Sequence, residues 1–173
     1  MEPEEFDDFY TASFHRLVGQ VYAMIGDRDE AQECVQEAFV RAWSHRRQLE
    51  KARAPEAWVR TTAYRLAVSR WRRTVRSRRD PDRALQHRQY QQSTDDLNPD
   101  HVALVAALRR LPEAQRRAIV LHHMCDLPIA DVAAETGVPV GTVKARLSRG
   151  RTALMSLLGD RPTGGLTEGA THA

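Results

Sequence analysis

Apolar residues recur at intervals of three and four positions along most of this sequence, which is the spacing of one face of an α-helix. The longest such stripe consists of Phe6, Phe9, Tyr10, Phe14, Leu17, Val18, Val21, Tyr22 and Ile25. It stops at Gly26, and glycine commonly follows the last turn of a helix. The alternation typical of a β-strand is nearly absent. The pattern therefore predicts an all-α protein.

Two further helices are expected in the first half of the chain. Asp27 and Glu30 have the spacing of a capping box, and they precede a second apolar stripe of Ala31, Cys34, Val35, Ala38, Phe39, Ala42 and Trp43. Helices joined by so short a turn pack antiparallel. Residues 44–54 are typical of a polar loop, after which Pro55 suits the first turn of a third helix. The narrow apolar face of that helix holds Trp58, Val59, Thr62, Ala63, Leu66 and Ala67.

The helical spacing is interrupted at residues 80–100, where apolar residues are few. Such a segment buries too little surface to fold by itself, so we expect a flexible linker. Periodicity resumes in four expected helices, at residues 101–111, 113–124, 128–137 and 139–158. The sequence thus predicts two small helical domains, 1–79 and 101–158, followed by a disordered Gly/Thr-rich tail at 159–173.

The net charge of +3 averages two oppositely charged parts of the chain. Residues 1–40 hold ten acidic and two basic residues, whereas residues 60–88 hold ten arginines and two aspartates. Such asymmetry indicates contact with nucleic acid, although a solvated basic helix is the simpler alternative.

Composition excludes several classes of protein. No stretch reaches the roughly 18–20 apolar residues that span a bilayer, and the acidic start of the chain lacks the basic and apolar regions of a secretory signal. Two cysteines, Cys34 and Cys125, cannot form a disulfide framework. We therefore expect a cytoplasmic protein without a membrane span.

Residues 127–151 carry the spacing of a helix-turn-helix motif. Ala133 is the small residue needed where two helices cross, Gly137 tolerates the left-handed turn, and Val143 anchors the second helix. The outward and flanking positions of that helix are Thr142, Lys144, Ala145, Arg146, Ser148, Arg149 and Arg151. Small and basic side chains there can enter a major groove, where arginine pairs with guanine through two hydrogen bonds. The alternative is an ordinary helical hairpin with a basic solvent face.

Residues 45–79 are a second candidate for nucleic-acid contact. Positive charge clustered on one helix gives phosphate affinity that is independent of base sequence. Trp71 can stack on an unpaired base, whereas Trp58 lies on the apolar stripe and is expected in the core. The alternative is a solvated charged surface.

His122, His123 and Cys125 are spaced like part of a metal cluster. On a helix, however, the two histidines point about 100° apart, and no fourth ligand is visible. A Gly-rich phosphate loop, a Ser/His/Asp arrangement and paired carboxylates in an apolar setting are also missing from the sequence. We therefore expect no metal, no cofactor and no enzymatic activity. Cys34, on the apolar stripe, is expected to be a small core residue.

Three segments resemble, in order, conserved regions of the extracytoplasmic-function (ECF) class of bacterial RNA polymerase sigma factors. Residues 27–45 are similar to region 2.2, residues 55–73 to regions 2.3 and 2.4, and residues 108–151 to region 4. The resemblance covers nearly all of residues 5–158. It implies a factor that binds core RNA polymerase, recognises the −35 and −10 promoter elements, and melts the −10 region to start transcription of a specific regulon.

The resemblance also implies roles for individual residues. Docking on the clamp helices of the polymerase β′ subunit is implied for Gln36, Glu37, Phe39, Val40 and Arg41, and the second domain is implied to contact the β flap. Capture of a flipped −10 base is implied for a loop that offers His45, Arg46, Arg47, Gln48 and Lys51. Further −10 contacts are implied for Arg60, Arg65, Arg70, Trp71, Arg72 and Arg73, and −35 contacts for the outward and flanking residues of the helix-turn-helix. The family also implies an anti-sigma factor, although no residue of the sequence indicates one.

The chain departs from the family pattern at three places. Cys34 stands where the family often has leucine, Thr62–Arg65 lack a usual asparagine, and Ser69 replaces a frequent aspartate. These changes keep the expected fold intact but leave the base sequence of the −10 element open.

Two other classes of protein are compatible with some of these residues. A stand-alone helix-turn-helix repressor or activator would use its N-terminal helices for dimerisation or sensing, and would not depend on core polymerase. A metal sensor or enzyme at His122, His123 and Cys125 would carry stoichiometric metal.

Overall fold

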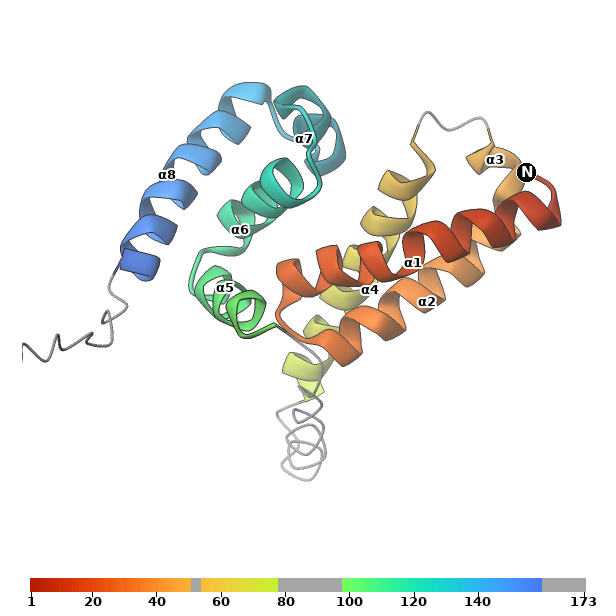
Figure 1. Ribbon diagram of the computed structural model, residues 1–173, viewed down its shortest axis with the longest axis horizontal. Coiled ribbons are helices and arrows are strands. Elements are labelled where there is room, and N and C mark those ends of the chain that lie inside the picture. The colour runs from red at the N-terminus through yellow and green to blue at the C-terminus, as the bar shows by residue number, and fades with distance from the viewer. Residues whose placement is uncertain (51–53, 78–97, 160–173) are drawn as a thin grey trace, which may run out of the picture.

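The computed structural model of the protein describes residues 1–50, 54–77 and 98–159. Within these residues the chain forms α-helices and one π-helical turn but no strand, which confirms the expected all-α fold. The first group of helices consists of α1 (Pro3–Ile25), α2 (Arg28–Ser44), α3 (Arg46–Leu49) and α4 (Pro55–Ser77). The second group consists of α5 (Pro99–Arg109), α6 (Glu113–Ile119), the π-turn η2 (Val120–Met124), α7 (Ile129–Thr136) and α8 (Val140–Gly159), and it lies to one side of the first (Figure 1). The expected linker up to residue 97 and the tail from residue 160 are outside the described residues.

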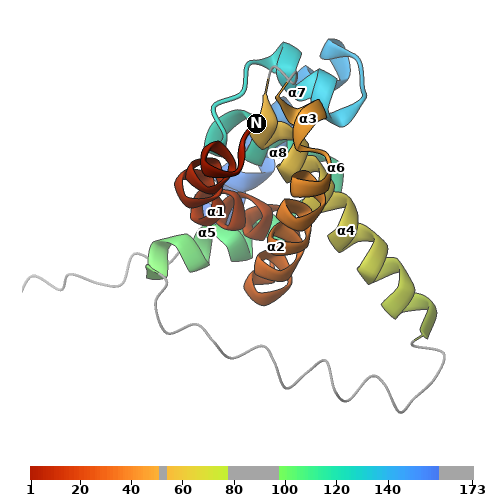
Figure 2. The same ribbon diagram turned by 90° about the vertical axis from the view of Figure 1, so that its right-hand side faces the viewer.

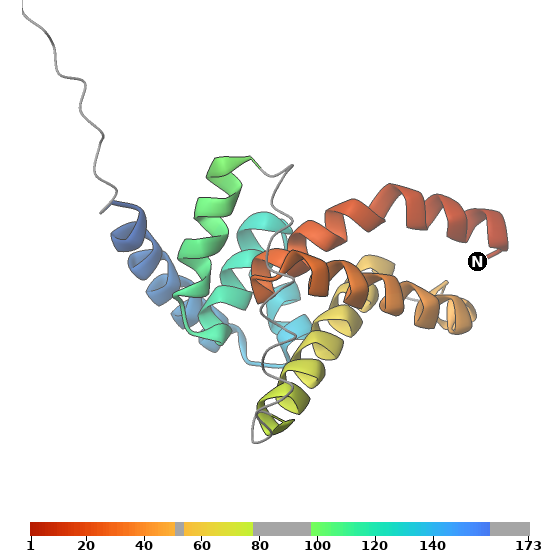
Figure 3. The same cartoon turned by 90° about the horizontal axis from the view of Figure 1, so that it is seen from below.

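The turn between α1 and α2 forms as the sequence predicts. Gly26 adopts left-handed backbone angles (φ 78°), and its N–H donates to the carbonyl of Tyr22 at 2.7 Å. Asp27 then accepts a hydrogen bond from the Glu30 N–H at 3.0 Å. The Glu30 carboxylate is turned elsewhere, toward Cys34 and Arg70, so only the Asp27 half of the expected capping box forms. The turn leaves α1 and α2 antiparallel (Figure 3).

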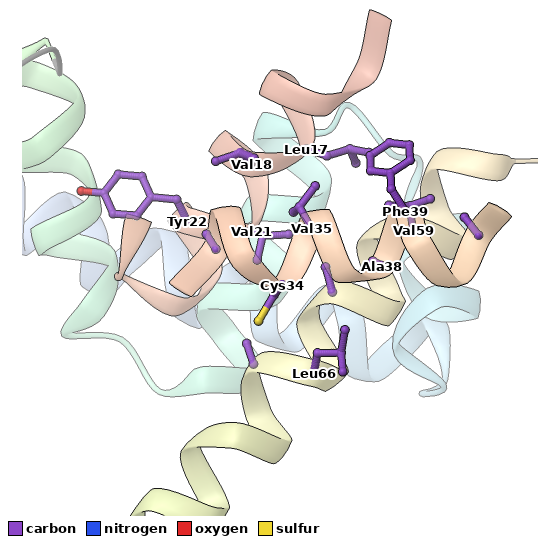
Figure 4. Packing of buried hydrophobic residues seen from close by; sticks show 14 of the residues in the cluster. Leu17, Val18, Val21, Tyr22, Cys34, Val35, Ala38, Phe39, Val59 and Leu66 are labelled. Carbon is purple, nitrogen blue, oxygen red and sulfur yellow. The ribbon is translucent and has the colours of Figure 1, made fainter. Parts of the chain in front are cut away.

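The core of the first group lies between α1, α2 and α4. Leu17, Val35 and Val59 are fully buried there, and Figure 4 shows them gathered with Phe39. Alanines on the facing stripes let the helices approach closely, which favours dense packing. Trp58 is partly buried against this core, as expected.

The core of the second group extends across the boundary between the groups. Val132, Val143 and Leu147 form its centre. The same cluster includes Ala23 and Met24 of α1, together with Tyr64 of α4. Helix α1 accordingly packs against α5, α6 and η2. The two helical groups therefore share buried apolar surface.

One local prediction was wrong in part, and another is confirmed in its bounds but differs in the type of helix. The expected loop at residues 44–54 contains the short helix α3, which forms because Leu49 is buried beneath it. The expected helix at residues 113–124 widens into η2 after Ile119, where the Cys125 N–H donates to the Val120 carbonyl at 3.0 Å. Both features depend on tertiary burial that local spacing does not show.

Candidate nucleic-acid and polymerase interfaces

The helix-turn-helix is formed by α7 and α8. Gly137 takes left-handed angles (φ 70°), and its N–H donates to the carbonyl of Ala133 at 2.9 Å. The Val138 N–H reaches the same carbonyl at 3.2 Å, so the end of α7 is closed by two bonds. Val143 and Leu147 anchor α8 in the core. The turn and the anchors are at the positions that the sequence predicts.

The outward face of α8 is basic and accessible. Lys144, Ala145, Ser148, Arg149 and Arg151 are exposed, while Thr142 and Arg146 are half-buried. Within the described part of the chain, no acidic side chain forms an ion pair with these cations. Their charge is therefore not neutralised by the neighbouring helices. Such a face can bind phosphates and the edges of bases in a major groove.

A small polar cavity lies at the end of α2. It has a volume of about 330 Å³ and is lined by Ser44, His45, Arg46, Arg47 and Gln48. The Arg46 guanidinium stacks on the Trp43 ring at 4.4 Å. The structure thus brings four of the five predicted base-capture residues together, and the fifth, Lys51, is outside the described residues.

The predicted −10 residues of α4 divide into two sets. Arg65, Trp71, Arg72 and Arg73 are exposed, and Trp71 retains 63% of its surface. The C-terminal part of α4 projects beyond the packed helices (Figure 2). Arg60 and Arg70 are instead bound to acidic side chains of the same chain.

Arg70 binds three carboxylates of α2. Its guanidinium nitrogens lie 3.3 Å from Glu30, 3.1 Å from Glu33 and 2.7 Å from Glu37. These ion pairs join α4 to α2. Glu37, one of the predicted polymerase contacts, is therefore also part of a structural network, and hydrogen bonds from Arg41 and Arg70 lower its pKa.

Arg60 is buried between the two helical groups. Its side chain is 4% exposed and that of its partner Glu135, on α7, is 6% exposed. Nε and Nη2 of Arg60 donate to the two carboxylate oxygens of Glu135 at 2.9 and 2.7 Å, and Nη1 donates to the buried side chain of Gln20 at 3.1 Å. Burial lowers the pKa of Arg60, but the Glu135 carboxylate more than offsets this and raises the pKa above its ordinary value. Arg60 therefore remains a charged, fully partnered cation.

The predicted polymerase-docking residues all lie on α2 but differ in how exposed their side chains are. Gln36, Val40 and Arg41 of α2 are exposed, and Val40 retains 65% of its surface. Phe39 is buried, and its ring contacts those of Phe6 and Tyr10 on α1. An exposed apolar side chain beside polar ones is a common pattern at protein interfaces. In this structure, Phe39 packs in the core between α1 and α2 and does not contribute to the outer surface of α2.

The cysteines and paired histidines form no cluster of potential metal ligands in the described ranges. Cys34 and Cys125 are both free thiols, and burial raises their pKa to about 12 and about 11. Thiols with raised pKa are poor nucleophiles at neutral pH. Nδ1 of His122 donates a hydrogen bond to the carbonyl oxygen of Leu127 at 2.7 Å.

Sequence reasoning missed the residues that join the two groups. Glu135 and Gln20 bind Arg60, and Glu113 and Arg117 contact Tyr64. No local pattern marks them, because each contact joins helices that are distant in the sequence.

Both helical groups match models of known protein families. The models "Sigma-70 region 2" and "Sigma-70, region 4" match residues 9–77 and 101–154. Sigma factor SigW of Bacillus subtilis is 29% identical over 88% of this chain and 87% of its own length. EcfG of Rhodopseudomonas palustris is 30% identical over 79% of this chain and 75% of its own length. SigL of Mycobacterium tuberculosis is 32% identical over 77% of this chain and 78% of its own length.

Solved structures agree with this assignment. The sigma factor RpoE of Bartonella quintana, in complex with the anti-sigma factor NepR, has a TM-score of 0.76 at 25% identity and covers 91% of this chain and 99% of its own. CnrH, in complex with the cytosolic domain of CnrY, shares the fold with a TM-score of 0.67, covering 91% of this chain and 90% of its own at 20% identity.

The fold and the two matched regions define a sigma-70-type initiation factor, which gives RNA polymerase its promoter specificity. More narrowly, the chain belongs to the extracytoplasmic-function class of RNA polymerase sigma factors. No helix among the described residues is long and apolar enough to cross a membrane.

Proposed function

We propose that this ECF sigma factor recognises its promoters with two separate surfaces. The outward face of α8, from Thr142 to Arg151, reads the −35 element. The cavity at His45–Gln48 and the exposed residues of α4 hold the melted −10 element. We propose domain limits of 1–79 and 101–158, with residues 80–100 as a linker and 159–173 as a tail.

The observation that carries the −35 assignment is the accessible basic face of α8. Its cations face away from the core, and none forms an ion pair within the described residues. Arginine at such a position can donate two hydrogen bonds to a guanine, which is worth about 1–3 kcal/mol of discrimination.

The −10 assignment is supported by the chemistry of the first helical group. Opening DNA costs about 1.4 kcal/mol per base-pair step in stacking. An extruded base in a polar cavity and a single strand on exposed cations and an aromatic ring can offset that cost. The cavity at Ser44–Gln48 and the exposed Trp71, Arg72 and Arg73 provide these groups.

Polymerase docking is assigned to α2 through Gln36, Glu37, Val40 and Arg41, with Phe39 fixing the helix from inside. We place the protein in the cytoplasm, where core RNA polymerase acts, as a binding factor without catalytic activity of its own. An anti-sigma factor is proposed as a further partner, because the structural relative RpoE of Bartonella quintana was solved with one.

The test is transcription in vitro with core polymerase and a promoter library. Arg149→Ala is expected to weaken −35-dependent transcription by roughly 1–3 kcal/mol, only at promoters with the matching base. The exposed Arg110, at the end of α5 and outside the proposed surfaces, provides Arg110→Ala as a matched control with unchanged output. Uniform loss across all −35 sequences would make Arg149 a phosphate contact. If the unaltered protein opens no promoter but binds duplex operators tightly, it is a stand-alone regulator instead.

A further inference from the structure

Two adjacent histidines precede the helix-turn-helix. His122 and His123 belong to the π-turn η2, which follows α6 directly. Their rings meet edge to face, with centroids 4.8 Å apart and an angle of 70° between the ring planes. Single π-turns within helices are frequent at functional sites. Neither the −35 nor the −10 assignment uses these two residues.

The π-turn is brought toward α8 by a close approach at Gly150. This glycine is buried, and a Cβ built on it would lie 2.9 Å from the Ile119 side chain and 3.5 Å from that of Gln115. Gln115 and Ile119 are therefore on the side of α6 that faces α8. His123 follows Ile119 by four positions, so it continues that side of the helix. The next residue of α8, Arg151, is close enough for its charge to act on the His123 imidazole.

Arg151 also belongs to the outward face of α8. It follows Lys144 and Ser148 at intervals of four and three, so these three side chains lie on one side of the helix. His123 and Arg151 are both exposed. Within the described ranges neither of them forms an ion pair with an acid. An arginine and a titratable imidazole from two different helices thus stand together at the edge of this face.

A helix in the major groove has a phosphate backbone on either side, and phosphate contacts set its position without reading bases. We propose that His123 and Arg151 form a binding site for a backbone phosphate beside the −35 element, to which His123 contributes a charge only when it is protonated. Promoter binding is then tighter in mildly acidic than in alkaline solution. This proposal rests on the −35 assignment of α8 and adds a contact from outside the helix-turn-helix.

The surroundings of His123 favour its neutral form in the free protein. Partial burial lowers the pKa of His123 below its ordinary value, and the neighbouring His122 and Arg151 lower it further. The other titratable or charged groups on the elements around η2 are Tyr22 of α1, Glu113, Arg116 and Arg117 of α6, Asp131 and Glu135 of α7, Arg146 and Arg149 of α8, and Asp126 in the turn after η2. Because none of the acids among them raises the pKa of His123, the imidazole is mostly neutral at neutral pH.

Phosphate binding and protonation of His123 strengthen each other, because a phosphate stabilises the imidazolium. The pKa of His123 is therefore higher in the DNA complex than in the free protein. Affinity for the promoter is lowest above the pKa of the complex. It rises as the pH falls between the two pKa values and is constant below the pKa of the free protein. Each unit between the two values corresponds to about a tenfold change in the dissociation constant.

The test measures how tightly holoenzyme, formed from core polymerase and the full chain, binds a labelled duplex promoter selected from the transcription library. The dissociation constant is measured between about pH 5.5 and about pH 8, on both sides of the ordinary histidine pKa, and at several salt concentrations. His123→Gln removes the titratable charge, and His123→Lys makes it permanent. His15→Gln is the matched control, because His15 is an exposed histidine on α1, outside the proposed surfaces.

The unaltered protein and His15→Gln should bind the promoter more tightly as the pH falls. His123→Gln should match the unaltered protein at about pH 8 and lack the gain in acid, whereas His123→Lys should bind tightly throughout. The salt dependence gives a second signature. In acid, the logarithm of affinity should fall with the logarithm of salt concentration by about one unit of slope more for the unaltered protein than for His123→Gln. In alkaline solution the two slopes should be equal.

The proposal is wrong if His123→Gln keeps the gain in acid, or if His15→Gln loses it as completely, because the effect then comes from another group or from net charge. It is also overturned if His123→Lys binds no more tightly than the unaltered protein in alkaline solution, since no phosphate is then within reach of this position. Circular dichroism of each variant checks that the helical content is unchanged.

Arg149→Ala separates failure of this proposal from failure of the −35 assignment. If only the phosphate site is wrong, Arg149→Ala still weakens binding at promoters with the matching base, while both His123 variants behave like the unaltered protein. If the −35 assignment is wrong, Arg149→Ala leaves the affinity unchanged at every promoter as well.

Discussion

Replacement of Gly137 tests whether the turn of the helix-turn-helix is held by backbone conformation alone. The residue has left-handed angles (φ 70°, ψ 29°), and a Cβ built on it meets no atom within 4 Å. Gly137→Ala therefore adds no steric clash. Any change in stability must come from the backbone.

The size of the effect can be worked out from two opposing terms. An alanine in the left-handed region costs roughly 1–2 kcal/mol. The same substitution restricts the unfolded chain, which returns roughly 0.4–1 kcal/mol. The net loss is about 1 kcal/mol of the free energy of unfolding. Gly137→Asn should lose less than this, because asparagine tolerates left-handed angles through its short polar side chain.

The assay is urea unfolding followed by the circular dichroism signal of the helices. With a slope of about 1–3 kcal/mol per molar urea, the midpoint should fall by roughly 0.3–1 M for alanine. The slope should stay constant. An alanine variant as stable as the unaltered protein, or an asparagine variant less stable than the alanine one, would refute the backbone explanation.

Two further predictions concern packing and pH. Gly150→Ala should destabilise the second helical group by roughly 1–3 kcal/mol in the same assay, since its Cβ would lie 2.9 Å from the buried Ile119 side chain; a more stable variant would contradict this. Hydrogen bonds from Arg41 and Arg70 lower the pKa of Glu37, so their stabilising effect is present above the ordinary glutamate pKa and is lost as pH falls through the lowered value. Urea titrations at a series of acidic pH values should show a smaller loss of stability for Glu37→Gln than for the unaltered protein, and equal losses would argue against the network.

Features that depend on neighbours in the sequence could be predicted without the structure. The helices follow from apolar spacing, and the left-handed turns at positions 26 and 137 follow from the glycines there. The exposed basic face of α8 follows from the position of Val143, because a residue that anchors a helix determines which side faces outward. Each of these rests on interactions within one or two helical turns.

Roles that depend on a distant partner could not be predicted in this way. Arg60 and Arg70 are as basic as Arg72 in the sequence, yet their carboxylate partners lie on other helices, 75 positions away for the Arg60–Glu135 bond and 33 for Arg70–Glu37. The sequence shows which residues are charged, but it does not show whether each charge is exposed to solvent or paired with a distant carboxylate.

The sequence alone was sufficient to establish an all-helical chain with a helix-turn-helix and a basic middle segment, because helix formation and turn geometry are local. Only the tertiary structure showed which cations are accessible and that Met24 and Tyr64 enter the core of the second group. Burial depends on how whole helices pack, and that packing pairs Arg60 with Glu135 rather than leaving it exposed to solvent.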